Sequence, residues 1–359
     1  MNFETYHIND SIYSHRELLD HAKESKLSVS VPEWEQQIFG FIHAFLLGEL
    51  PIVQQTSGTT GVPVPFSLNR DSMIKSANRT LEHFELQQGD RTLHCLPMHY
   101  VAGKMMVVRA LVGGLNLLMV EPSSRPLRQI QSGIQFAAMV PLQVFESLQN
   151  RDNLELVDKL LIGGGEIYQE LKTELSALEN TVCFESFAMT ETYTHFAVRQ
   201  INGAEADPDF QLMKDVVISL DKRGCLVVDL PGVIDEPVIT NDLVNIDSAG
   251  RRFSWLGRID NVINSGGIKI IPEILEKRIR KLLGFNCLIL SQRDDRLGEQ
   301  IVLVVETDLP SPPVEEWKET LLANLEKYLV PKQILTVTEI PRNASFKPDR
   351  NATRKIIHR

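Results

Sequence analysis

Cysteine is scarce in this chain of 359 residues, and its placement excludes the sites that depend on it. The sequence holds only four cysteines, and no two of them form a Cys-x-x-Cys pair. Such wide spacing disfavours both a disulfide framework and a zinc site, and it predicts reduced, mostly buried thiols. The four are Cys95, Cys183, Cys225 and Cys287.

Basic charge and long apolar runs are also lacking. Lysine and arginine number 37 against 47 acidic residues, which gives a net charge of −10 with no basic tail or stripe. A general binder of nucleic acid or of anionic membranes is therefore not expected. The longest apolar stretches, 38–47 and 115–120, are too short or too interrupted to span a bilayer, and residues 1–5 do not begin a signal peptide. We expect a cytoplasmic protein without stable membrane insertion.

After residue 50 the sequence alternates between short apolar runs and helical patterns. Residues 1–50 themselves are expected to be helical, around Trp34 and Phe41. The alternation predicts an α/β fold. The expected strands are 91–96, 115–120, 136–140, 159–162 and 182–185, and the expected helices are 70–87, 101–112, 141–149 and 166–178.

The pattern changes twice further along the chain. Strands dominate the part that precedes Asp260, with a hairpin at 215–230, which indicates a β-rich subdomain. After Asp260 a glycine turn, two helices and several strands predict an α+β unit of about 100 residues. We therefore expect two domains, a large α/β domain at 1–259 and a small one at 260–359.

A loop of glycine, serine and threonine follows the apolar run 50–53 and offers the chemistry of a phosphate cradle. Glycines let consecutive backbone N–H groups converge on an anion, and the hydroxyls add further donors. The loop is not a Walker motif, because no Gly-Lys-Ser/Thr follows it. Taken alone, it is equally compatible with a solvated turn. Its residues are Thr56, Ser57, Gly58, Thr59, Thr60 and Gly61.

A second segment, just after the strand expected at 182–185, offers an aromatic face, a hydroxyl and a carboxylate in Phe187, Thr190 and Glu191. A carboxylate near a triphosphate is suited to hold Mg²⁺, directly or through water. Two other interpretations stay open: Glu191 as a carboxylate in the first turn of a helix, and Glu191 with His195 as a metal pair. A glycine run after the preceding strand offers bare backbone to a flat ligand, or is an ordinary turn: Gly163, Gly164 and Gly165.

The remaining polar motifs lie around the expected domain boundary and near the C-terminus. Asp242 ends an apolar strand, where it can accept hydrogen bonds from both ribose hydroxyls or simply form a turn. Arg258 is a candidate contact for ribose or phosphate, and Asp260 is a candidate hinge. The polar segment 341–350 carries Lys347, a cation able to swing onto a phosphate.

The order and spacing of these motifs resemble those of the adenylate-forming superfamily, which comprises acyl-CoA synthetases, luciferases and peptide-synthetase adenylation domains. The resemblance covers the chain from about residue 50 to the end. The family's motifs are T-S-G-T-T-G-x-P-K, Y-G-x-T-E, T-G-D, G-R-x-D and P-R-T-x-x-G-K. Their counterparts here are Thr56–Val64, Phe187–Glu191, Thr240–Asp242, Gly257–Asp260 and Pro341–Lys347.

The chain departs from these motifs at four positions. Val64 stands in place of the loop lysine, and Ala188, Asn241 and Phe346 each replace a glycine. The first subdomain is also shorter than is usual in the family, so that Thr56 comes early. Because the catalytic positions survive, the resemblance implies a trimmed enzyme with weakened nucleotide binding.

The resemblance implies a two-step reaction that uses ATP, Mg²⁺, a carboxylic acid and coenzyme A. The acid first forms acyl-AMP and pyrophosphate, with Lys347 and Thr190 as catalytic residues and Glu191 as catalytic residue and metal ligand. Lys355, in a T-R-K-I ending, is the competing candidate for the adenylation lysine.

In the second step, the resemblance implies that the small domain rotates about Asp260. This mobile domain would remove its lysine and present the loop at Gly266 and Gly267, so that the thiol of coenzyme A attacks the acyl-AMP. Whether two copies of the chain pair as a homodimer stays open.

The stretch 96–110 lies where the family's acyl-pocket helix begins, and it carries His99, Lys104 and Arg109 as candidate acid-binding residues. A second carboxylate on the substrate would form charge-assisted hydrogen bonds with such a cation, whereas a solvated helix face is the simpler role. The run A-G-K-M-M-x-V-R-A is similar to the short bacterial o-succinylbenzoate–CoA ligases of menaquinone biosynthesis. A generic aryl or medium-chain acyl-CoA ligase and a non-catalytic adenylate-binding homologue are the alternatives.

Overall fold

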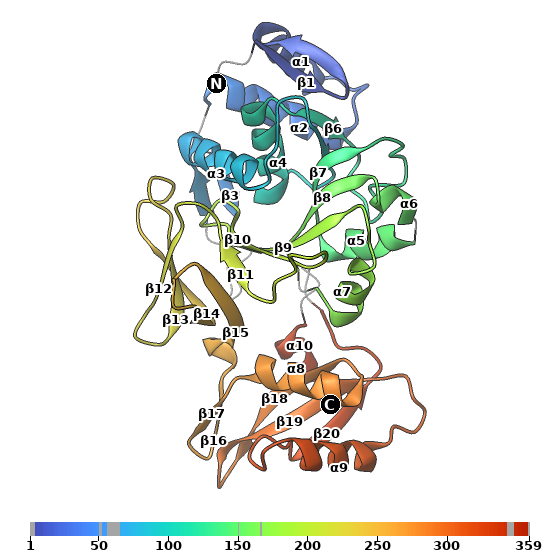
Figure 1. Ribbon diagram of the computed structural model, residues 1–359, viewed down its shortest axis with the longest axis vertical. Helices are drawn as coiled ribbons and strands as arrows, with labels where there is room; N and C mark the ends of the chain where they lie inside the picture. The colour runs from blue at the N-terminus through green and yellow to red at the C-terminus, as the bar shows by residue number, and fades with distance from the viewer. Residues whose placement is uncertain are drawn as a thin grey trace. The chain divides into compact units, whose positions relative to one another are not determined.

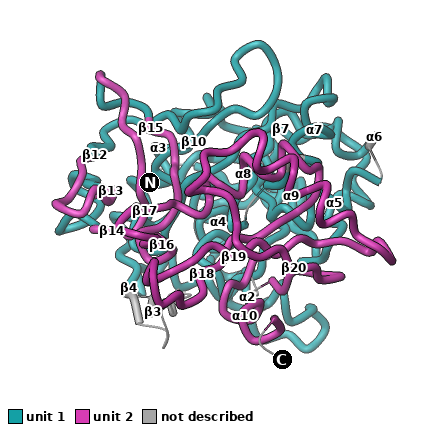
Figure 2. Tube along the Cα trace, turned by 90° about the horizontal axis from the view of Figure 1, so that it is seen from below, with its two compact units in different colours: residues 1–218, 228–238, 249–252 teal, residues 219–227, 239–248, 253–359 magenta. Residues whose placement is uncertain are grey.

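The computed structural model describes residues 4–49, 52–55, 65–149, 151–165, 167–342 and 348–357. The chain divides into two compact units (Figure 2). The first comprises 1–218, 228–238 and 249–252, and the second comprises 219–227, 239–248 and 253–359. The domain boundary expected between residues 259 and 260 stays a prediction.

A mixed β-sheet forms the core of the first unit (Figure 1). Its strands lie side by side in the order β2-β1-β6-β5-β7-β8-β9-β10-β11. In this order, each pair of neighbouring strands from β1 across to β9 is parallel, whereas β2, β10 and β11 are antiparallel to their neighbours. The strands are β1 Thr5–Ile8, β2 Ser11–Ser14, β5 Arg91–His94, β6 Asn116–Met119, β7 Ile134–Met139, β8 Val157–Ile162, β9 Val182–Ala188, β10 His195–Gln200 and β11 Phe210–Leu212.

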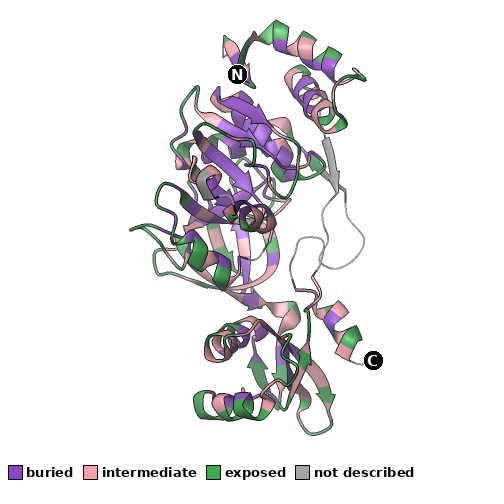
Figure 3. Ribbon diagram, turned by 90° about the vertical axis from the view of Figure 1, so that its right-hand side faces the viewer, coloured by how far each residue is buried: buried purple, intermediate pink, exposed green. Residues whose placement is uncertain are grey.

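The parallel strands β6 and β7 are apolar along most of their length because both faces of this part of the sheet are covered. The strand β6 is buried at every position, and β7 is buried at all but one (Figure 3). These continuous apolar runs are the signal that made the α/β class predictable from the sequence.

The helices of the first unit begin and end where local chemistry favours it. Ser14 and Glu17 form a reciprocal capping box at the start of α1, and Pro141 occupies the first position of α5, where a missing N–H costs nothing. Gly114, with φ of 62°, ends α4 in the left-handed conformation. The helices are α1 His15–Ser25, α2 Glu33–Leu47, α3 Arg70–His83, α4 Val101–Gly113, α5 Pro141–Leu148, α6 Arg151–Leu154 and α7 Gln169–Leu175.

The prediction that residues 1–50 are helical throughout is wrong for the first part. The strands β1 and β2 form an antiparallel hairpin there, and β1 adds in parallel to β6. The reversal is made by Asn9 and Asp10, whose φ angles of 48° and 63° suit the tight turns that join twisted strands. Two strands of four residues are too short to show a clear sequence period, so the turn residues were the available signal.

Between residues 217 and 258 the chain forms the expected β-rich subdomain, in which β12, β13, β14 and β15 pair in that order. The predicted hairpin is confirmed, because Asp221 accepts hydrogen bonds from the N–H groups of Arg223 and Cys225 across its turn. The strands are β12 Val217–Leu220, β13 Cys225–Asp229, β14 Val238–Ile246 and β15 Arg252–Arg258, and the 3-10 helix η1 Ile259–Asn261 follows.

The C-terminal part of the second unit is a small sheet with helices on both faces. Its central strand, β19, pairs with β18 along its whole length, with β20 in parallel, and with β16 at Gly298. Helices α8 and α9 share a core with one face, and Ile357 of α10 packs on the other. The elements are β16 Ile263–Ser265, β17 Ile268–Ile270, α8 Pro272–Leu283, β18 Cys287–Asp294, β19 Gly298–Glu306, α9 Val314–Asn324, β20 Gln333–Val337 and α10 Arg350–Ile357.

Two expectations from composition can be compared with this fold. All four cysteines are free and buried, as predicted. Within the described part of the chain, none of the helices has both the length and the apolar character needed to cross a bilayer.

Candidate active site

The predicted phosphate loop joins two paired strands. The strands β3 Ile52–Gln55 and β4 Pro65–Leu68 are antiparallel, and Gln55 is paired with Pro65. The loop residues Thr56–Gly61, and Val64 after them, lie outside the described residues, so their role stays a prediction.

The glycine run follows β8, and Phe187 lies near the end of the adjacent parallel strand β9. Gly163 comes directly after β8, and a side chain at this position would run into Ser186 of β9, whose hydroxyl donates to the Ile162 carbonyl at 3.1 Å. Gly164 has φ of 81°, a conformation that glycine adopts without strain. The two strands approach closely here because no side chain intervenes.

The ring of Phe187 is part of an aromatic cluster. Its centroid lies 5.6 Å from the ring of Phe196 and 5.1 Å from that of Phe210, both in edge-on geometry. Such packing fixes the orientation of the ring at the end of β9. A planar ligand lying beside it would meet a surface that is already ordered.

Thr190 and Glu191 lie in the turn that joins β9 to β10. The N–H of Tyr193 donates to the Thr190 carbonyl at 3.0 Å, and the Thr192 hydroxyl bonds Met189 and Thr194. The interpretation of Glu191 as a carboxylate in a helix's first turn is therefore wrong, because two antiparallel strands meet here. Glu191, whose side chain is partly buried, is the next residue after Thr190 on this hydrogen-bonded turn.

The alternative metal pair of Glu191 and His195 finds no support. His195 is buried in β10, where its Nε2 lies 3.4 Å from the Thr80 hydroxyl, and burial lowers its pKa well below the usual value. Across the described residues, no three His, Cys, Asp or Glu side chains gather in a way that could hold a metal ion.

Arg109 is buried in α4 with a side chain that is almost completely enclosed. Its residue is 2% exposed, one guanidinium nitrogen donates to the Thr194 hydroxyl at 3.2 Å, and another to the Met106 sulfur at 3.3 Å. The Nε of Arg109 has no hydrogen-bond partner among the described residues. Burial lowers the pKa of Arg109 to about 9, and no carboxylate of the described chain forms an ion pair with it.

The solvated helix face, the simpler role considered for the basic residues of α4, is therefore wrong for Arg109. Its contact with Thr194 joins the helix to the turn that carries Glu191. The missed signal was the composition of α4, which is apolar on nearly all sides and so predicts a buried helix.

Lys104 lies in the first turn of α4 and His99 lies just before that helix, and the two have different surroundings. The Lys104 ammonium donates to the Met98 carbonyl at 2.7 Å, and partial burial lowers its pKa. His99 is exposed, with its ring centroid 4.0 Å from that of Tyr100. Their roles as acid-binding residues remain predictions.

In the second unit, residues of the predicted ribose motif contact residues of the predicted hinge motif. Asp242 of β14 is paired with Arg258 of β15, and their charged groups are 3.9 Å apart. Arg258 also forms an ion pair with Asp260 at 2.7 Å, and the Asn241 amide donates to both Asp260 oxygens at 3.1 Å. Trp255 donates its indole N–H to Asp242 at 3.0 Å.

Asn241 and Trp255 were not assigned any role from the sequence. Asn241 occupies a motif position where the family has glycine, so its substitution was the available signal. Nothing in the pattern marked Trp255, because its contact with Asp242 depends on the pairing of β15 with the neighbouring strand β14.

The remaining predicted residues have mixed outcomes. Gly266 and Gly267 form the turn between β16 and β17, with φ angles of 60° and 84°, as the glycine pair predicts. Lys347 lies outside the described residues. Lys355, its competitor, is exposed on α10.

Comparison with known proteins identifies the family. The family model described as AMP-binding enzyme matches residues 46–219. An acyl-CoA synthetase (AMP-forming)/AMP-acid ligase II-like protein from Dyadobacter fermentans is 32% identical, with 90% of this chain and 94% of that chain covered and a TM-score of 0.62. The chain belongs to the AMP-forming acyl-CoA synthetases.

Other acyl-CoA synthetases extend this likeness. The 2-succinylbenzoate–CoA ligase of Escherichia coli is 26% identical over 318 residues, which cover 85% of this chain and 68% of that protein. An O-succinylbenzoate coenzyme A synthetase from Bacillus subtilis, solved in complex with ATP and magnesium, has a TM-score of 0.74 at 16% identity and covers 98% of this chain and 97% of that one. The second comparison supports the fold, and the mixed α/β fold predicted from the sequence is confirmed.

The turn at Glu191 suits the magnesium ion that an AMP-forming synthetase uses. Magnesium in phosphate-transfer sites is typically held by one or two carboxylates, waters and substrate phosphates. A partly buried carboxylate on a hydrogen-bonded turn meets that requirement without a cluster of protein ligands. Within the described residues, Glu191 fits the role of a magnesium ligand, and that role stays a prediction.

Proposed function

We propose that this adenylate-forming CoA ligase acts on o-succinylbenzoate, in the class of reaction that serves menaquinone biosynthesis. The observation that carries the proposal is the buried guanidinium of Arg109, with which no carboxylate of the described residues forms an ion pair. An isolated buried cation destabilises a fold unless a partner neutralises it. A substrate with one carboxylate to activate and a second to be recognised provides that partner, and the likeness to a 2-succinylbenzoate–CoA ligase points to the same acid.

In the first half-reaction, a substrate carboxylate oxygen attacks the α-phosphorus of ATP. A new phosphorus–oxygen bond forms while the bond to pyrophosphate breaks, so acyl-AMP and pyrophosphate are the products. The glycine run from Gly163 and the ring of Phe187 would hold the adenine, and the loop Thr56–Gly61 the phosphates. Thr190 and Lys347 would stabilise the charge that develops on the phosphate oxygens.

Bound Mg²⁺ neutralises charge on the phosphate oxygens, and Glu191 is the residue that would hold it. Asp242 and Arg258 would bind the ribose hydroxyls, since the two are paired across neighbouring strands. Trp255 fixes the Asp242 carboxylate through its indole N–H, which keeps that side chain oriented before the nucleotide binds.

In the second half-reaction, the sulfur of coenzyme A attacks the acyl carbonyl, and AMP leaves. We propose that the small domain turns about Asp260 between the two steps and brings the hairpin of Gly266 and Gly267 to coenzyme A. Two glycines with positive φ give that hairpin a bare backbone, which an extended thiol substrate can approach closely.

The acid, ATP, Mg²⁺ and coenzyme A are the partners that this proposal requires, in a cytoplasmic setting. A generic aryl or medium-chain acyl-CoA ligase is the main alternative. It shares every feature of the nucleotide site and differs only in the groups that meet the acid.

The test of the proposed reaction is the fate of ATP. We expect Mg²⁺-dependent formation of AMP and pyrophosphate that requires o-succinylbenzoate, followed by a thioester when coenzyme A is added. Release of ADP and phosphate would contradict adenylation. Nucleotide binding without turnover on any acid would make the chain a non-catalytic homologue.

A further inference from the structure

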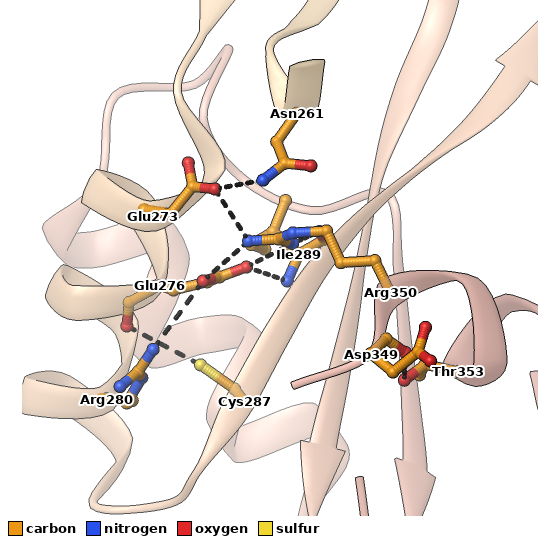
Figure 4. Close-up of polar contacts among 9 residues, drawn as sticks. All are labelled: Asn261, Glu273, Glu276, Arg280, Cys287, Ile289, Asp349, Arg350 and Thr353. Carbon is orange, nitrogen blue, oxygen red and sulfur yellow. Dashed lines mark hydrogen bonds and ion pairs between the residues drawn. The ribbon is translucent and has the colours of Figure 1, made fainter. Parts of the chain in front are cut away.

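The side chain of Arg350, the first residue of α10, is mostly enclosed by groups of the second unit with which it pairs. Its side chain is 14% exposed. It bonds the Glu276 oxygens at 2.7 and 3.2 Å and a Glu273 oxygen at 3.3 Å, and it donates to the Ile289 carbonyl at 2.5 Å. Figure 4 shows the guanidinium lying between the two glutamates of α8 and the strand β18.

This contact closes a free edge of the sheet. Among the described strands, β18 pairs with β19 on one side only, so the outward N–H and carbonyl of Ile289 need other partners. The N–H donates to Glu276 at 2.7 Å, and the carbonyl accepts from Arg350. Burial raises the pKa of Glu276, and the Arg350 cation opposes that effect. The start of α10 is thereby locked to both α8 and β18.

The same cluster reaches the segment that contains the proposed hinge. Glu273 accepts a hydrogen bond from the Asn261 amide at 2.5 Å, one residue beyond Asp260. A side chain at Gly257 would run into the Glu273 carboxylate, so the glycine of the G-R-x-D motif leaves room for it. Arg350 and Asn261 therefore bind the same oxygen of Glu273.

The chain on the N-terminal side of residues 343–347 is also fixed to its neighbours. The Asp349 N–H donates to the Pro341 carbonyl at 2.7 Å, and Arg342 and Pro348 form an isolated β-bridge. Arg342 forms an ion pair with Glu306 of β19 at 3.5 Å. The residues on both sides of 343–347 are thus anchored to one body.

We infer that Arg350 is a positioning residue for the adenylation half-reaction, which fixes the start of α10 to α8 and to the hinge segment. It thereby sets where the connection that bears Lys347 is anchored. The inference rests on the proposed function, in which Lys347 acts on the α-phosphate. Arg350 itself touches no substrate in this account.

The test needs a variant that removes the link and still folds. Removing Arg350 alone would leave Glu276 buried and charged, so the double variant Arg350→Met with Glu276→Gln removes both charges together. In Glu276→Gln the amide oxygen can still accept from the Ile289 N–H. Arg354→Ala is the matched control, because Arg354 lies on the same helix and bonds only Asn351 among its described hydrogen bonds.

Each variant is compared in three measurements: acyl-AMP formation from acid and ATP, thioester formation from supplied acyl-AMP and coenzyme A, and thermal unfolding. We expect the double variant to lose about 10²-fold in the first half-reaction, because small misplacements of a catalytic group have effects of that size. The second half-reaction should stay close to wild type. Arg350→Lys, which keeps the charge without the two-pronged contact, should show a smaller loss confined to the same step.

A loss shared equally by both half-reactions, in step with a lower unfolding temperature, would overturn the inference and leave a structural role. An unchanged first half-reaction in the double variant would overturn it as well. Lys347→Ala is run in parallel: if it keeps acyl-AMP formation, the lysine assignment in the proposed function fails and the inference falls with it. The inference alone would be overturned, and the proposed function kept, if the wild type is active, Lys347→Ala is inactive and the double variant is unaffected.

Discussion

Each of the two units contains an arginine with little exposure to solvent, Arg109 and Arg350, and the two have opposite surroundings. Arg109 of α4 contacts a hydroxyl and a sulfur, and none of the described carboxylates pairs with it. Arg350 of α10 contacts two carboxylates and a backbone carbonyl. Burial lowers the pKa of Arg109 to about 9, whereas the neighbouring carboxylates raise that of Arg350 against the effect of burial.

The difference separates two uses of a buried charge. A charge that is paired inside the protein has already formed its interactions, so it holds elements together. A charge without a partner destabilises the free protein, and that cost is recovered only if a ligand brings the opposite charge. Arg350 is accordingly assigned to architecture and positioning, and Arg109 to recognition of the acid.

The largest expected effect on stability comes from replacing Arg350. Arg350→Met leaves the buried Glu276 carboxylate without its cation, so we expect the free energy of unfolding to fall by about 3–5 kcal/mol. Adding Glu276→Gln should restore most of it, because the most deeply buried carboxylate of the cluster is then uncharged and Glu273 keeps its contact with Asn261. Urea unfolding of both variants measures this, and a double variant as unstable as the single one would contradict the pairing argument.

A second test concerns His94, which is buried in the first unit and has no carboxylate among its described hydrogen-bond partners. Burial lowers its pKa to about 4, whereas the unfolded value is about 6.5. Between these values the unfolded chain binds the extra proton, so the stability contributed by neutral His94 is complete above pH 6.5 and is lost as the pH falls to 4. The loss amounts to about 3 kcal/mol.

The variant His94→Gln isolates the contribution of His94 to stability between pH 6.5 and pH 4. Its free energy of unfolding should fall less than that of the wild type between pH 6.5 and pH 4, because glutamine does not titrate. Urea unfolding at several pH values gives the difference between the two profiles. Parallel profiles would show that His94 does not carry this part of the pH dependence.

A smaller effect of opposite sign is expected at Arg109. Arg109→Met removes a buried charge that none of the described carboxylates pairs with, so the free energy of unfolding should rise by about 1 kcal/mol. Thr194 keeps a partner in this variant, because its hydroxyl also lies 3.2 Å from that of Ser76. A destabilised Arg109→Met protein would mean that the guanidinium is architectural, like Arg350, and the contrast between the units would disappear.

Local sequence signals predicted much of the fold. The helix α8 begins at Pro272 and ends before Gly284, and the turn at Asp221 is formed by that residue's own side chain, so both are encoded within a few residues. The hairpin of β1 and β2 was missed because its strands are short. The helix α10 was missed because the segment is polar, and its burial depends on glutamates more than 70 residues away.

The site was predictable to a similar degree. Motif order indicated that Asp242 and Arg258 belong together, and pairing of β14 with β15 brings them into register. The burial of Arg109 did not follow from its residue type, because only the packing of α4 encloses it. The contact between Arg109 and Thr194 spans 85 residues and has no sequence signature.

The most direct test of the account is the ratio of kcat/KM for o-succinylbenzoate to that for benzoate, in the wild type and in Arg109→Met. Benzoate lacks the second carboxylate, so the wild type should prefer o-succinylbenzoate by about 10³-fold or more, since unpaired buried charges are penalised by several kcal/mol. In Arg109→Met the ratio should fall towards one through loss of o-succinylbenzoate turnover, with little change for benzoate. Comparable turnover of both acids by the wild type, or an undiminished ratio in the variant, would contradict the proposed recognition.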